Sequence, residues 1–122
     1  MKKISEMTMN ELTMCLSKMA EPASNLFRDA AVTEALKEMR DRAPEKCTIE
    51  MAFSLFTTIV VPVLTGEKHI QHTHAILAAL DGVSAAEIGK RNGLETLKDM
   101  FLVFAIDKDV ESIFRPCVQA RP

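Results

Sequence analysis

The chain has 122 residues, 48% hydrophobic content and a net charge of -2, so it can bury one core but is too short for two well-formed domains. Its balanced charge gives no overall field that would attract nucleic acid or an anionic membrane. The three cysteines follow no CxxC or CxxH spacing, which indicates a reducing compartment and no disulfide framework. We expect a single helical domain over residues 1–122 with frayed ends near 1–6 and 117–122, and no export signal.

The first predicted helix begins after Thr8, because Thr8 and Glu11 have the spacing of a capping box. Five of the first nineteen residues are methionines, whose flexible thioether side chains can adapt to different protein surfaces. The helix therefore presents a candidate stripe for partner binding, made of Met9, Leu12, Leu16 and Met19. The alternative is that these side chains, Leu12 and Leu16 in particular, fill the core.

The next predicted helix is separated from the first by Glu21-Pro22, which either ends the first helix or kinks it, since proline lacks an N–H and crowds the preceding turn. Asp29 can cap the second helix, which should end near Asp41. Arg42-Ala43-Pro44 then interrupts the helical spacing. Pro44 suits the first turn of the helix that follows.

That helix holds the most apolar part of the chain, because residues 51–64 contain no charged side chain. The run is shorter than the about 18 to 20 apolar residues of a membrane span. At helical spacing its small hydroxyl residues lie opposite one broad apolar side. This side comprises Ile49, Ala52, Phe53, Leu55, Phe56, Ile59 and Val60. The pattern predicts a central core helix near 48–61, which Pro62 ends or bends.

The C-terminal half repeats these start and stop signals. Gly66 allows the chain to turn, and helical spacing resumes from Glu67 to Leu80 before Asp81-Gly82 closes the helix. Ser84 and Glu87 have the spacing of a second capping box, which predicts a short helix.

Asn92-Gly93 should end this short helix in left-handed geometry. One more helix runs to about Ala105, and Asp107 can cap a last turn before Pro116. The sequence thus predicts an all-α fold, a compact bundle of five to seven helices around the central apolar helix near 48–61.

Three histidines, His69, His72 and His74, raise the possibility of a metal site, because imidazole is a common metal ligand. On one helix, His69 and His72 lie about 60° apart but His74 lies roughly 140° from His69, and no cysteine or acidic residue has ligand spacing. We expect a half-buried or solvated cluster without metal, or a pH-sensitive contact. No set of residues indicates catalysis or a cofactor, so we do not expect an enzyme.

Residues 76–91 imitate a helix-turn-helix, with an apolar helix, a tight turn and a Ser-capped second helix. The second helix presents Ala85-Ala86-Glu87 where side chains that read bases are needed, and its basic Lys90 and Arg91 lie at the far end. A DNA-binding regulator is the alternative function, and the acidic chain opposes it.

A series of short motifs follows Pro62 in a definite order and covers a little over half of the chain. They are Val61-Pro62-Val63-Leu64, Ile76-Leu77-Ala78-Ala79-Leu80-Asp81-Gly82, Ser84-Ala85-Ala86-Glu87-Ile88, Arg91-Asn92-Gly93-Leu94-Glu95-Thr96, Ile106-Asp107-Lys108-Asp109 and Phe114. Their order and spacing resemble the tail assembly chaperones of long-tailed, non-contractile bacteriophages and their prophages. The chain departs from that pattern in having one Phe near its end where two are common, Val110 where Leu is common, and a histidine-rich connection.

The resemblance implies a non-enzymatic, all-helical protein of the host cytoplasm. Its partners would be the tape measure protein and the tail-tube protein, and copies would associate with one another along the tape measure. The family often makes a longer product by ribosomal frameshifting, and this chain would be the shorter one.

Overall fold

A computed structural model describes residues 4–106 of the chain. These residues form helices, and no strand occurs among them. The α-helices are α1 (Met9–Phe27), α2 (Ala30–Arg42), α3 (Ile49–Leu55), α4 (Val61–Leu64), α5 (Ile70–Asp81), α6 (Ala85–Gly89) and α7 (Gly93–Phe101). The predicted all-α fold is confirmed. The last turn predicted between Asp107 and Pro116, and the frayed end near 117–122, lie outside the described residues.

Several helices begin and end at the predicted capping residues. Thr8 Oγ1 accepts the Glu11 N–H at 3.2 Å, and the Glu11 carboxylate accepts the Thr8 N–H at 3.3 Å, so the capping box is confirmed. Asp29 and Ser84 each accept an N–H from the first turn of the following helix, at 2.9 and 3.3 Å. Gly82 ends α5 with a φ of 71°, which is the left-handed geometry that glycine adopts without strain.

Helix α1 passes through Pro22 without ending. Its buried residues continue at helical spacing on both sides of the proline, and they are Cys15, Met19, Ala23, Leu26 and Phe27. Packing of this side, mainly against α5, outweighs the hydrogen bond that Pro22 cannot donate. A 3-10 turn, Ile4–Glu6, precedes α1 and buries Ile4, so residues 4–6 of the predicted frayed segment near 1–6 are helical, and residues 1–3 lie outside the described residues.

The predicted central helix is a continuous rod of α3, a wide π turn (Phe56–Val60) and α4. Thr48 begins it, because Thr48 Oγ1 accepts the Met51 N–H at 3.2 Å, so the prediction that Pro44 lies in its first turn is wrong. In the π turn the Val61 N–H donates to the Phe56 carbonyl, five residues back. The ring of Pro62 crowds the preceding turn, which accounts for the wide turn before it.

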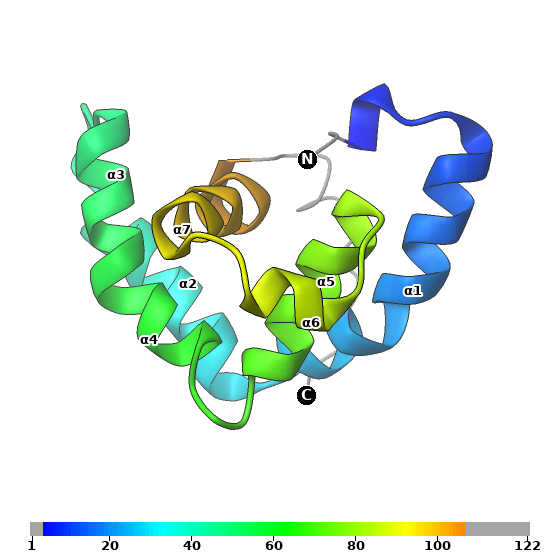
Figure 1. The fold of residues 1–122 in the computed structure, drawn as a ribbon. Coiled ribbons are helices and arrows are strands. Elements are labelled where there is room, and N and C mark those ends of the chain that lie inside the picture. Colours follow the sequence, from blue (N-terminus) through cyan, green and yellow to red (C-terminus); the bar gives the residue numbers. More distant parts are fainter. Residues whose placement is uncertain (1–3, 107–122) are drawn as a thin grey trace.

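Burial is centred on α5. Figure 1 shows α5 and α6 between α1 on one side and the rod on the other. The rod has a buried second half, with Phe56, Val60 and Leu64 in the core, whereas α3 has no buried residue. The helix predicted near 48–61 is therefore in the core only along its second half. The reason is that α2 packs on the π turn and α4 rather than on α3.

Asn92 begins a helix instead of ending one. Its φ is -55°, and its Oδ1 accepts the Glu95 N–H at 3.1 Å, so it caps α7. The predicted left-handed end at Asn92-Gly93 is wrong, since asparagine serves equally well at either end of a helix. Helix α7 continues into a second π turn, Leu102–Ile106. Its Phe101 ring meets Phe53 and Phe56 of the rod edge-on, with centroids 5.2 and 5.5 Å apart.

Replacing Phe56 with alanine should lower the free energy of unfolding by about 3 to 5 kcal/mol, because Phe56 is fully buried against Phe101. The sequence places Ile59 on the same apolar side as Phe56, but Ile59 is only partly buried, so Ile59→Ala should cause a smaller loss. Exposed Thr58→Ala is the control, with a change of about 0.5 kcal/mol or less. Urea unfolding followed by circular dichroism measures all three, and equal losses would contradict this order.

Candidate partner-binding surfaces

The stripe predicted on α1 does not form one exposed surface. Met9 is 76% exposed, whereas Met19 is 0% exposed and lies in the core. Leu12 and Leu16 are partly buried against the core, and Met14, which the predicted stripe omitted, is exposed. The prediction of Met19 as a partner-binding surface residue is therefore wrong. Ten residues at about 100° each leave Met9 and Met19 roughly 80° apart, so they lie on different sides of α1.

Separate substitutions at these two methionines should give different results. Met19→Gln should lower the melting temperature by about 5 °C or more, because it buries an amide in an apolar core. Met9→Gln should leave the melting temperature within about 1 °C, because the side chain is exposed. Thermal unfolding followed by circular dichroism tests both. A large shift for Met9→Gln would place this side chain in the core as well.

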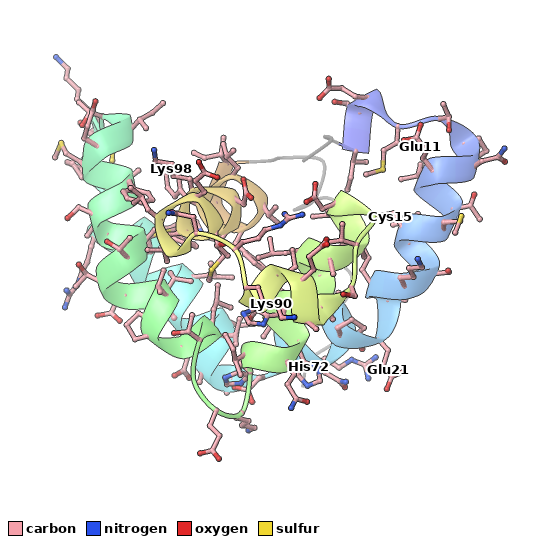
Figure 2. The ribbon with its side chains drawn as sticks, viewed as in Figure 1. Glu11, Cys15, Glu21, His72, Lys90 and Lys98 are labelled. Atoms are coloured by element: carbon pink, nitrogen blue, oxygen red, sulfur yellow. The ribbon has the colours of Figure 1, made fainter. Side chains whose placement is uncertain are left out.

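The three histidines of the predicted cluster have different environments. His69 is buried, whereas the sequence predicted a half-buried or solvated side chain. His72 and His74 are partly buried. Figure 2 shows His72 near the first turn of α5. Within residues 4–106, no group of three or more His, Cys, Asp or Glu side chains is placed to hold a metal ion.

His69 connects the end of α4 with the start of α2. Its Nδ1 lies 3.1 Å from the Val63 carbonyl oxygen, and its Nε2 lies 3.2 Å from Asp29 Oδ2. The Nε2 contact lacks the direction of a hydrogen bond, so it acts as an ion pair when the imidazole is charged. Lys68 Nζ lies 2.8 Å from the same Asp29 oxygen. Lys68, with a smaller contribution from His69, holds the pKa of the Asp29 carboxyl well below its usual range.

The charge of Asp29 should make stability depend on pH in the acid range. A carboxyl whose pKa is depressed in the folded state stabilises the fold above its unfolded pKa, and this stabilisation is lost as the pH falls. Asp29→Asn keeps a side chain that can cap α2 but removes the charge. Between about pH 5 and pH 2 the wild-type protein should therefore lose more stability than Asp29→Asn. Urea unfolding at a series of pH values measures this, and parallel curves would contradict it.

The region that imitates a helix-turn-helix has a short second helix and an arginine that is paired within the protein. Its second helix, α6, has only five residues. The Arg91 guanidinium pairs with Asp81 at the end of α5 and lies 4.0 Å from the Glu87 carboxylate, so it is held within the protein. Lys90, the residue that follows α6, is exposed, but one such cation contributes little affinity at physiological salt.

Exposed apolar side chains also occur on α3 and α7, where the sequence did not predict a partner surface. Ile49, in the first turn of α3, is 70% exposed, and Leu94 of α7 is 56% exposed. Leu102, directly after α7, is 44% exposed. The sequence assigned Ile49 to the core, and the hydrophobic spacing alone contains no signal that it is uncovered.

These features define an all-α protein with large apolar side chains exposed on several helices. No helix within the described residues combines the length and the apolar character needed to cross a membrane. Comparisons of the chain with protein-family models, curated proteins and solved structures found no match.

Proposed function

We propose that this protein is a tail assembly chaperone of a long-tailed, non-contractile phage or prophage. It binds the tape measure protein in the host cytoplasm, helps to recruit tail-tube subunits and associates with further copies of itself, without catalysing a reaction. The observation that carries the proposal is the exposure of large apolar side chains on three helices, represented by Met9, Ile49 and Leu94. Such side chains lose contact with water when a protein partner covers them.

The motifs behind the resemblance lie at helix boundaries of this fold, which supports the proposal. Residues 61–64 are α4, and residues 76–82 form the end of α5 with its Gly82 cap. Residues 84–88 contain the cap and the body of α6, and residues 91–96 contain the cap and the first turn of α7. In this chain these motifs therefore follow the order of α4, α5, α6 and α7 with their caps.

A tape measure protein is a suitable partner on physical grounds. Long helices with apolar stripes associate with one another unless another protein covers the stripes. Met9 and Met14 on α1 supply flexible thioether side chains, which adjust to targets without a repeated sequence. The partly buried Leu12 and Leu16 lie on the same side of this helix as Met9.

Co-expression with the tape measure protein encoded nearest to this reading frame tests the proposal. The tape measure protein should become soluble and should carry the chaperone with it through purification on an affinity tag. An unrelated tagged helical protein is the control, and it should retain none of the chaperone. Met9→Gln should weaken co-purification without changing the melting temperature, because the side chain is exposed.

A tape measure protein that stays insoluble and unbound would remove the chaperone function. Titration of duplex DNA distinguishes the alternative. Binding below about 1 μM with a steep dependence on salt would favour a DNA-binding regulator. The proposed function requires no such binding.

A further inference from the structure

Met9 lies on an uncharged side of helix α1. At about 100° per residue, the residues of 9–20 that lie within roughly 60° of Met9 around the helix carry no charge. We name this set, which comprises Met9, Leu12, Thr13, Leu16 and Ala20, the uncharged side of α1. Leu12 and Leu16 are partly buried against the core, whereas Met9 is 76% exposed. Met9 therefore adds exposed apolar area next to side chains that pack on the core.

Met14 is the second exposed methionine of α1, and it has polar surroundings. Its side chain is 60% exposed, and it lies roughly 140° from Met9 around the helix. Glu11 and Lys18 lie three residues before it and four residues after it, so both adjoin it on the helix surface. The two methionines thus have similar access to solvent but opposite neighbours, which makes Met14 a matched control for Met9.

Other methionines of the described chain have less access to solvent. Met51 of α3 is 44% exposed, whereas Met19 and Met100 lie in the core with 0% and 2% exposure. A small oxidant reaches a thioether sulfur in contact with water far more easily than one enclosed in a packed core. An oxidant in solution should therefore react with Met9 and Met14 well before it reacts with Met19 and Met100.

We propose that Met9 is a site of reversible oxidation by peroxides, and that its sulfoxide switches off binding at the uncharged side of α1. Hydrogen peroxide transfers one oxygen atom to the thioether sulfur. The O–O bond breaks, an S–O bond forms and water leaves, so the sulfur is oxidised by two electrons and the peroxide is reduced. A methionine sulfoxide reductase reverses the step with two thiols, which form a disulfide while the oxygen leaves as water.

The inference rests on the proposed function, since it describes regulation of the surface to which that function assigns Met9. A partner that covers Leu12 and Leu16 also covers the neighbouring Met9. A sulfoxide there would bury a polar oxygen, which is unfavourable without a hydrogen-bond donor. The one hydroxyl of the uncharged side, on Thr13, already donates to the Met9 carbonyl at 2.8 Å. A sulfoxide on Met14 would instead lie among charged side chains that remain in water.

Peroxide treatment of the full-length protein, followed by tandem mass spectrometry, tests the selectivity of oxidation. Met9 and Met14 should gain oxygen at similar rates, about tenfold or more faster than Met19 and Met100. In urea the buried methionines should react as fast as the exposed ones. If Met9 of the folded protein reacts as slowly as Met19, the inference is overturned.

Leucine variants test the effect on binding, because leucine keeps an apolar side chain and cannot be oxidised. Peroxide treatment should lower retention of the wild-type protein on a tagged helical segment of the tape measure protein by about tenfold. A methionine sulfoxide reductase should restore it. Met9→Leu should bind equally before and after treatment, although it keeps Met14, Met51 and the exposed Cys47. Met14→Leu should lose binding as the wild type does.

The untreated wild type separates this inference from the proposed function. If it retains no tape measure protein, the proposed function fails and the switch fails with it. If it binds but peroxide leaves binding unchanged, or if treated Met9→Leu loses binding as the wild type does, the switch fails and the proposed function stands. Treatment should leave the melting temperature within about 1 °C, because Met9 is exposed. A larger drop would attribute the loss of binding to unfolding and overturn the switch.

Discussion

The carbonyl groups at the end of α4 constrain the rest of the structure, because two side chains from the start of α5 and the residue before it satisfy them. Thr73 is fully buried and donates its hydroxyl to the Leu64 carbonyl at 2.8 Å, and His69 Nδ1 lies 3.1 Å from the Val63 carbonyl oxygen. A buried carbonyl without a partner would cost about 1 to 3 kcal/mol. These contacts fix α5 against the rod, and α5 in turn packs on α1 and α6.

Features that depend on neighbouring residues could be predicted from the sequence, and features that depend on distant residues could not. The caps at Thr8, Asp29 and Gly82 are local, and each lies where the sequence predicted it. Asn92 was assigned to the wrong helix because both of its possible roles are local and only the packed chain selects one. Apart from Pro62, no residue near the π turns predicts them. A π turn persists only when the helical segments before and after it both pack on the rest of the protein.

Met19 and Ile49 show the same limit for the binding surfaces. The sequence placed Met19 on a partner surface and Ile49 in the core, and the structure reverses both positions. Helical spacing tells which side of a helix is apolar, but it does not tell how far the neighbouring helix extends along that side. Met19 lies where α5 covers α1, whereas Ile49 lies one turn beyond the contact of α3 with α7.

The π turn between Phe56 and Val60 also affects how the length of this chain can vary during evolution. A π turn accommodates one residue more than an α-helical turn while keeping the helices on either side in phase. Loss of one residue within 56–60 would convert it into an ordinary turn, and α3 and α4 would keep their orientations. The same loss within α5 would rotate one end of that helix by about 100° and turn buried side chains toward water. Related chains can therefore differ by one residue at this turn and still share the fold.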